Sequence, residues 1–505
     1  MKCHKSEFRF IKKSPLAPLF QRGGDNPLHP PLIRGYSSLW QREVKRDFKI
    51  YGIYIFLMFS LTACASVQTA QEWEKTKAFA VERTGMEPRW EQTADDAEFI
   101  QNEVSKLLSD GLTEDEAVRI ALMNNRRLQA FFEEIGMAKA DLVQAGLLTN
   151  PDLSEVFRFP FGGGGADIEA AGILKISDFW QIPLRKKAAA AELEAKLSKV
   201  AEEMLNTVSE IKHILNGYIA LSLIKNETEK MKKQFDELRE HLIYRQKFGL
   251  EQEFDIYMAG ASSLEQQLEL MRTEKDLQVA RSRLNRVLGL SPVQYTYEVT
   301  GMLPAQFRPL PDLETLLAHA CAVRPDVRMA EKRIEESEHI LALERKRIFR
   351  DVDAGPAYAR DTDGTDFLGP EVKLQLPLFD QNQAQIAKAE YKVRQAQKEL
   401  QSKMSDIREE VSSTLERILL ARKEIELIRD GILPLRGDAV SYAEKYVDAM
   451  QMNMLHLLEA KQKLVETNRH FFEALRDHRD QEIELERVLG GMIPMSEGRP
   501  KSVGY

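Results

Sequence analysis

The residues best able to do chemistry gather in one short stretch, AMQMNMLHLLEA, which contains Met450, Met452, Met454 and His456. Thioether sulfur is a soft ligand that favours Cu(I), so a transient copper or silver contact is one hypothesis for this stretch. Methionine-rich segments also form adaptable packing and docking surfaces. The sequence therefore leaves both interpretations open.

The rest of the chain offers no catalytic motif. The cysteines Cys3, Cys64 and Cys321 lack metal-ligand spacing, and the nine histidines are not clustered. The glycine run at residues 161–167 lacks the lysine and the helix start of a phosphate loop. There is no nucleophile elbow and no carboxylate pair in a pocket-like context. We therefore expect a protein that is not an enzyme, with no catalytic residue and no cofactor.

The segment before Cys64 has the pattern of an export signal. Residues 50–61 are apolar, follow a basic stretch, and are too few to span a bilayer, which needs about 20 residues. The ending Leu-Thr-Ala-Cys resembles a bacterial lipobox, which implies acylation at Cys64 and, because Ala65 follows, delivery to the outer membrane. We expect a lipoprotein signal peptide at 44–63 and a spurious or disordered extension at 1–43. An anchor helix with an incidental cysteine is the alternative.

The chain contains one pattern twice. LTEDEAVRIALMNNRRLQAF begins at Leu112, LPDLETLLAHACAVRPDVRMAE begins at Leu310, and both copies end in RVLG. Corresponding positions stay about 200 residues apart. The predicted divisions are an N-terminal periplasmic segment 64–111, a first repeat 112–300, a linker 301–311, a second repeat 312–491 and a C-terminal tail 492–505.

Each repeat should contain very long helices. No proline occurs between Leu184 and Ser291, and the apolar residues recur near the coiled-coil period of 3.5. A helix of this length cannot fold into a compact domain and must lie against other long helices. We predict helices at about 185–245 and 255–289 in the first repeat, and at about 381–447, interrupted near Pro434, and 455–490 in the second.

Paired strands precede each long helix. The predicted strands, at about 151–161 and 168–180 and at about 352–360 and 368–378, alternate apolar and polar residues. Their length suits tilted membrane strands. Four strands cannot close around a channel, and an open sheet in lipid would leave backbone groups unpaired. Either several chains share one barrel, or the strands form a small soluble sandwich.

The two repeats of helix, strand pair, long helix and returning helix resemble TolC-type outer-membrane efflux factors over about residues 112–491. LQLPLFDQNQAQIAKAE, at 374–390, looks especially like the heavy-metal CzcC and CusC branch. The resemblance implies a mainly α fold: a long antiparallel coiled-coil helical barrel plus four transmembrane β-strands per chain, in a trimeric shared β-barrel. It also implies an outer-membrane location, a periplasmic adaptor and an inner-membrane pump of the RND type as partners.

Such a channel would conduct substrates, heavy-metal cations among them, passively from adaptor and pump to the exterior. It would be gated at its periplasmic helical turns, where Glu251, Glu253, Asp255 and Asp448 are the candidate charges. A duct for type I protein or peptide secretion and a periplasmic coiled-coil lipoprotein scaffold without a pore are the alternatives. The net charge of −8 argues against a nucleic-acid partner.

Overall fold

The computed structural model describes residues 66–162, 165–250, 252–291, 295, 297–304, 306–449 and 451–494. The chain divides into two compact units, Met1–Ser66 and Val67–Tyr505, and the description below concerns the second. The predicted extension 1–43 and signal peptide 44–63 lie outside the described residues. Among the described helices, none carries an apolar stretch long enough to cross a lipid bilayer.

The second unit is mainly helical, with one small antiparallel sheet. An N-terminal segment contributes α2 (Ala70–Thr84) and α3 (Ala94–Leu107). The predicted first repeat contains α4 (Glu114–Asn124), α5 (Arg126–Ala145), β1 (Asp152–Arg158), β2 (Asp167–Lys175), α6 (Asp178–Gln246) and α7 (Glu253–Leu288). The second contains α8 (Leu313–Val323), α9 (Pro325–Lys346), β3 (Val352–Arg360), β4 (Asp366–Leu374), α10 (Gln383–Glu426), the π-helical segment η1 (Leu427–Ile432), α11 (Leu433–Asp448) and α12 (Met454–Val488).

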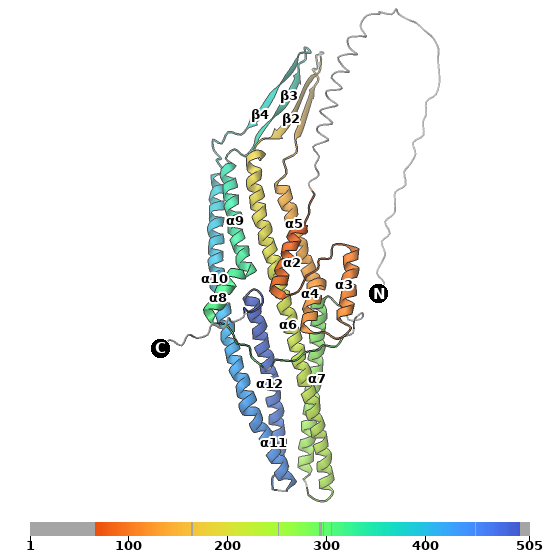
Figure 1. Ribbon diagram of the computed structural model, residues 1–505. Coiled ribbons are helices and arrows are strands. Elements are labelled where there is room, and N and C mark those ends of the chain that lie inside the picture. The colour runs from red at the N-terminus through yellow and green to blue at the C-terminus, as the bar shows by residue number, and fades with distance from the viewer. Residues whose placement is uncertain are drawn as a thin grey trace, which may run out of the picture. The chain divides into compact units, whose positions relative to one another are not determined.

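Figure 1 shows how these elements are arranged within the unit. The sheet lies at one end of the helices, and the α6–α7 and α11–α12 turns lie at the other. The strand order is β1-β2-β3-β4 with every neighbouring pair antiparallel. The N-terminal helix α2 packs on α6, where Lys75 Nζ lies 2.6 Å from Glu194 Oε1.

The longest helix, α6, has 69 residues and so extends about 100 Å. Its buried residues include Leu193, Leu197, Val200 and Met204, which follow the predicted apolar stripe. It begins earlier than expected: the strand predicted to reach residue 180 ends at Lys175, and the helix starts at Asp178. Beyond Lys175, the N–H groups of Ile176 and Ser177 both donate to the carbonyl of Val352, at 2.7 and 3.1 Å, so the regular strand pairing ends there and the chain turns into α6.

The second long helix departs from regular α geometry just before its proline. Helix α10 ends at Glu426, η1 follows, and α11 begins at Leu433 with Pro434 in its first turn. Proline lacks the N–H that would bond the carbonyl four residues earlier. The wider π turn accommodates that missing bond without ending the helix, as π-bulges do in other long helices.

Each repeat is closed by a clamp on its final RVLG turn. In the first, Asn125 Nδ2 donates to the carbonyl of Val287 at 2.7 Å. In the second, Arg324 Nη1 donates to the carbonyl of Val488 at 3.0 Å. These bonds satisfy carbonyls that a helix end leaves without intrahelical partners.

The glycine of the first RVLG turn is required by the close packing around it. Gly289 has φ of +68°, and a Cβ there would lie 2.2 Å from the carbonyl oxygen of Asn124. Only glycine combines this left-handed backbone with so close an approach. The first clamp therefore depends on a residue type as well as on a hydrogen bond.

Candidate functional site

The register of the sheet sorts its residues into two chemically different faces. Directly opposed residues lie on one face, so Ala170, Tyr358 and Leu368 share a face. We call it the apolar face: Leu153, Phe157, Ile168, Ala170, Leu174, Val352, Ala354, Pro356, Tyr358, Leu368, Pro370, Val372 and Leu374, with Glu155, Arg360 and Asp366 as its charged members. The opposite, polar face carries Asp152, Ser154, Arg158, Asp167, Glu169, Lys175, Asp353, Glu371 and Lys373, together with small residues and the apolar side chains Val156, Ile173 and Phe367.

The apolar face is open to its surroundings. Leu368 is 81% exposed and Val372 is 67% exposed. On the polar face, Arg158 Nη1 lies 2.8 Å from Asp167 Oδ2 and 2.6 Å from Glu169 Oε1. Most of the charged residues lie on the polar face, and most of the exposed large apolar residues lie on the other, which marks the apolar face as a contact surface.

The two outer strands leave their backbone unpaired within the chain. Strand β1 pairs only with β2, and β4 only with β3, among the described residues. An edge strand presents a row of free N–H and C=O groups that favours pairing with another chain. The sheet is therefore open at both edges.

The far ends of the long helices form a separate apolar cluster, which we call the tip cluster. It contains Met231, Phe235, Leu242, Ile256, Ala259, Ala443, Val447, Met454, Leu457 and Leu458. Met454 is 4% exposed within it, and Met452 packs against it. His456 is exposed. Residues two apart on a helix point in nearly opposite directions, so the structure does not bring Met454 and His456 together; Met450 lies outside the described residues.

The predicted gate charges occupy different surroundings. Asp255 is 7% exposed in the first turn of α7. Glu253 accepts a hydrogen bond from the hydroxyl of Tyr257 on its own helix. Asp448 is the last residue of α11, whereas Glu251, like Cys64, lies outside the described residues.

The contacts that join the two helical pairs lie further from the turns, and sequence reasoning missed them. Gln462 Nε2 donates to Ser262 Oγ at 2.9 Å, and Arg469 pairs with Glu269. Both contacts join α7 to α12, and each links residues 200 positions apart. That separation matches the offset between the repeats, so residues at equivalent places meet. We call these two contacts the coil ties.

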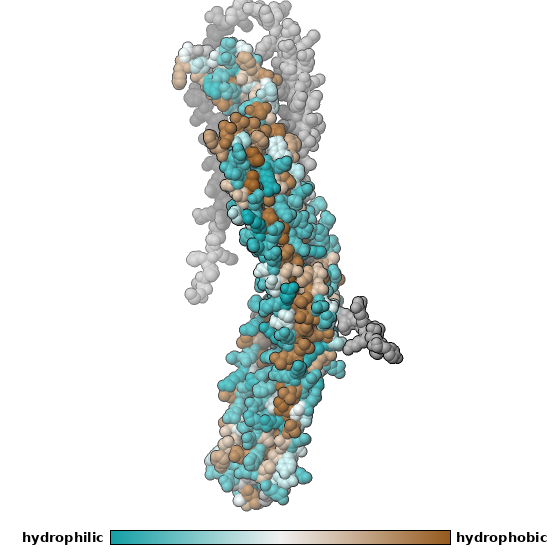
Figure 2. All heavy atoms as spheres, turned by 90° about the vertical axis from the view of Figure 1, so that its left-hand side faces the viewer, coloured by the Kyte–Doolittle hydropathy of each residue, from teal (hydrophilic) through white to brown (hydrophobic). Residues whose placement is uncertain are grey.

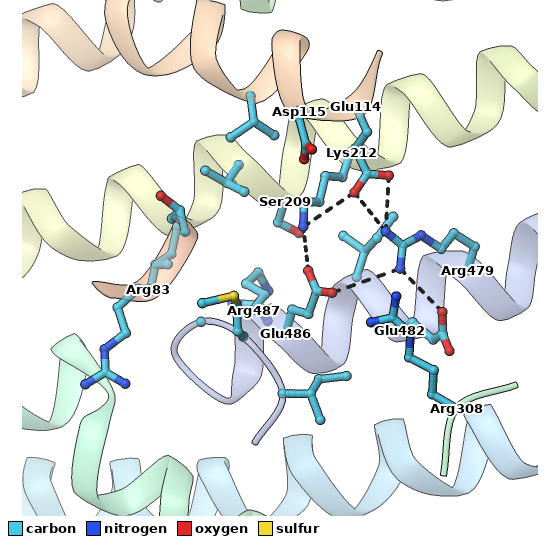
Figure 3. Close-up of a pocket in the computed structure, with 18 of the residues that line it drawn as sticks. Arg83, Glu114, Asp115, Ser209, Lys212, Arg308, Arg479, Glu482, Glu486 and Arg487 are labelled. Atoms are coloured by element: carbon cyan, nitrogen blue, oxygen red, sulfur yellow. Dashed lines mark hydrogen bonds and ion pairs between the residues drawn. The ribbon is translucent and has the colours of Figure 1, made fainter. Parts of the chain in front are cut away.

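A second polar network lies midway along the helices, around a cavity of about 830 Å³ (Figure 3). Lys212 Nζ lies 2.7 Å from Glu486 Oε2 and 3.5 Å from Glu114 Oε1. Arg479 lies 2.8 Å from Glu114 Oε1 and 3.4 Å from Glu482 Oε2. Burial lowers the pKa of Arg479, but these carboxylates outweigh it and raise that pKa above its ordinary value. The network fastens α4 and α6 of the first repeat to α12 of the second.

A buried histidine fixes the linker near this network. His478 is fully buried; its Nε2 accepts a hydrogen bond from Arg422 Nε at 3.2 Å. Its ring centroid lies 4.7 Å from that of Phe307, in the predicted linker 301–311. Burial, together with Arg422 and Arg479, lowers the pKa of His478 to about 4. Within the described ranges, no group of three or more His, Cys, Asp or Glu side chains is placed to hold a metal ion.

Comparison with known proteins places this geometry in context. Residues 316–491 match the family "Outer membrane efflux protein". A 226-residue stretch, 44% of this chain, is 24% identical to the cobalt-zinc-cadmium resistance protein CzcC of Cupriavidus metallidurans, of which it covers 53%. The chain thus spans about half the length of that curated relative.

Solved structures share the fold. The crystal structures of CusC superpose with a TM-score of 0.65 at 17% identity, covering 77% of this chain and 92% of CusC. The Campylobacter jejuni CmeC outer membrane channel gives a TM-score of 0.64 at 14% identity, covering 81% of this chain and 90% of CmeC. The resemblance predicted from the sequence is confirmed: the chain has the fold of TolC-type outer-membrane efflux channels, with similarity to CzcC and CusC, and its second repeat matches the outer membrane efflux protein family.

Proposed function

We propose that this protein is the outer-membrane channel of a tripartite efflux system, in which three chains share one β-barrel and one helical duct. The observation that carries the proposal is the sheet with one apolar face, one polar face and two open edges. In lipid every backbone group must be paired, so an open sheet needs further strands to close it. Three copies supply twelve strands, with lipid outside and water inside.

Exposed apolar stripes on the helices support lateral assembly. Helix α7 exposes Tyr257, Leu264, Leu268 and Met271, at the spacing of a single helical face. On α10, η1 and α11 the exposed residues are Leu420, Leu427, Leu435 and Tyr442. Figure 2, which faces the side where α10 and α11 lie, shows apolar surface extending along it. The two stripes lie on different helices. This arrangement suits a ring in which the α7 stripe of one chain packs against the α10–η1–α11 stripe of its neighbour.

The position of α2 is compatible with a lipid anchor at Cys64. Lys75 pairs with Glu194, which lies sixteen residues beyond the start of α6 at Asp178. That separation corresponds to roughly 24 Å along the helix. Arg83, later in α2, and Ser209, later in α6, line one cavity, so the two helices run in the same direction. The start of α2 therefore lies roughly 16 Å from the sheet end of α6.

Cys64 lies six positions before Ala70, the first residue of α2. A chain of that length reaches at most about 20 Å. An acylated Cys64 can therefore reach the level of the membrane sheet. Several acyl chains would give stable anchoring.

The cargo and partners follow from chemistry and similarity. We propose heavy-metal ions as cargo because the curated relative is a cobalt-zinc-cadmium resistance protein. The α6–α7 turn exposes Tyr244, Phe248, Leu250 and Phe254. An exposed aromatic patch of this kind suits a protein partner, here a periplasmic adaptor coupled to an inner-membrane pump of the RND type.

Four measurements test the proposal. The mass of the purified mature chain in detergent should be that of a trimer, and the trimer should conduct ions across a planar bilayer; a water-soluble monomer would refute the channel. Cys64→Ser should abolish acylation detected by mass spectrometry. A deletion strain should lose tolerance to cobalt, zinc, cadmium or copper, whereas loss of peptide export alone would favour a secretion duct.

A further inference from the structure

A small cavity lies where the sheet meets the helices. Its volume is about 330 Å³, it is open to the surface, and it is lined by the end of β2, the end of α9 with the segment that follows it, and the starts of α6 and α10. Four of its eight lining residues are cations and two are carboxylates. The lining residues are Lys175, Gln181, Arg185, Glu344, Arg347, Arg350, Asp351 and Gln385.

Two of the four cations are neutralised within the cavity wall. Lys175 Nζ lies 2.5 Å from Asp351 Oδ1. Arg347 Nη1 lies 2.6 Å from Glu344 Oε1. Both carboxylates of the lining are thereby engaged, so the positive charge of the other two cations is not balanced by the lining itself.

The two remaining arginines have unused donors. Arg185 Nη2 lies 3.2 Å from Asp178 Oδ1, but its Nε is buried with no hydrogen-bond partner. Arg350 Nη2 donates to Asn382 Oδ1 at 3.1 Å, and in the described part of the chain no carboxylate lies within ion-pair distance of Arg350. A guanidinium has five N–H donors and always carries its charge. Arg350 is therefore the cation in excess.

The group that holds Arg350 is itself rigidly fixed. Asn382 is buried and has φ of +62°, in the left-handed region that asparagine tolerates better than most residues. Its Nδ2 donates to the carbonyl of Glu344 at 2.7 Å and to the carboxylate of Glu344 at 2.8 Å. Both ends of its amide are thus occupied, which fixes the oxygen that receives Arg350.

We propose that this cavity binds a small oxyanion, that is, a solute bearing a carboxylate, phosphate or sulfate group. Arg350 supplies the main charge, since guanidinium N–H groups match such oxygens in pairs. Arg185 and the side-chain amide of Gln385, which line the same cavity, supply further donors. Lys175 lies on the polar face of the sheet. If the proposed barrel forms, the cavity opens to its water-filled side and favours anions there; this last step alone rests on the proposed function.

Binding is tested on the purified full chain in detergent, with inorganic phosphate as the probe and chloride at equal ionic strength as the reference. The expected result is saturable phosphate binding that weakens at least tenfold in Arg350→Gln. Arg345→Gln, five positions earlier near the end of α9 and paired with Glu390 outside the cavity, is the matched control and should bind as the parent does. Gln385→Leu, at the exposed start of α10, should also weaken binding and guards against a folding defect in Arg350→Gln. Equal phosphate affinity in the parent and in Arg350→Gln would overturn the proposal.

The source of the anion is tested in nanodiscs. A site for soluble anions should bind phosphate equally in phosphatidylcholine and phosphatidylglycerol discs. Loss of phosphate binding in the phosphatidylglycerol discs would assign the cavity to a lipid headgroup and overturn the assignment to a solute. In planar bilayers, Arg350→Gln should shift the reversal potential toward cation preference. A chain that binds phosphate but conducts no current would refute the channel and leave the site standing.

Discussion

The coil ties should hold the proposed duct closed, and removing them should open it. Glu269→Gln removes the charge opposite Arg469, which keeps its second partner Glu473. Gln462→Leu removes the donor to Ser262, whose hydroxyl still donates to the carbonyl of Met258 at 3.0 Å. Neither change leaves a buried group without a partner, so both report on the ties alone.

The size of the effect follows from burial. Arg469 and Glu269 are 47% and 24% exposed in their side chains, so their pair contributes at most about 1 kcal/mol. The hydrogen bond between Gln462 and Ser262 contributes about 1 kcal/mol. Together the ties stabilise the closed arrangement by about 1–2 kcal/mol per chain, or about 3–6 kcal/mol if three chains open together. The double variant should therefore raise the open-to-closed ratio by about 10²–10⁴-fold.

Single-channel recording in planar bilayers measures this ratio directly. Each single variant should give roughly half of the double variant's free-energy shift, because the ties are separate contacts. Lys233→Gln is the control, since Lys233 is 79% exposed and its one ion pair among the described residues is with Glu237 on the same helix. If the double variant conducts with the same open fraction as the control, the ties do not hold the closed state and this reasoning is wrong.

Three further changes test the packing that supports the duct, each by unfolding followed with circular dichroism. Gly289→Ala should lower the free energy of unfolding by more than about 3 kcal/mol, because the new Cβ has no room. Gly217→Ala, in open space within α6, should raise it by about 0.5–1 kcal/mol. Equal effects of the two substitutions would contradict the close packing described for the first clamp. Because the pKa of His478 is lowered to about 4, the imidazole binds a proton more readily in the unfolded chain than in the folded chain. The free energy of unfolding should therefore fall by about 3 kcal/mol as the pH drops from 6.5 to 4. His478→Gln should remove this pH dependence. Arg324→Met should cost about 3–5 kcal/mol of folding free energy. It should also raise the pKa of Asp326, followed by NMR titration of that carboxyl, because burial raises the pKa once the arginine that lowers it is gone; an unchanged pKa would show that another group controls Asp326.

The strand pattern could be predicted from the sequence because alternation along a strand is a local property. The predicted alternation is confirmed in β4, where Leu368 and Val372 lie on one face and Glu371 lies on the other. That the apolar rows of all four strands fall on one face depends on register, which is set by pairing between distant segments. The apolar residues of β2 (Ile168–Leu174) and those of β4 (Leu368–Leu374) come to share one face only when the strands pair.

The functional residues were harder to predict because their contacts depend on helix rotation. Met454 and His456 looked like one group in the sequence, yet a helix turns their side chains to opposite sides, one into the tip cluster and one to solvent. The coil ties, of which one joins Ser262 to Gln462, involve common polar residues that nothing in the sequence distinguishes from other polar residues. Their separation of 200 residues was the available clue, since equivalent positions of two repeats can meet near a symmetry axis.

The central claim is that the apolar face meets lipid and the polar face meets water. Adjacent residues Val372 and Lys373 lie on opposite faces of β4, so Val372→Cys and Lys373→Cys in a Cys321→Ser background place a nitroxide on each. In vesicles, the label at 372 should collide mainly with lipid-soluble oxygen and the label at 373 mainly with a water-soluble nickel chelate. Equal access of the chelate to both positions would contradict the claim, since it would place the sheet in water on both sides.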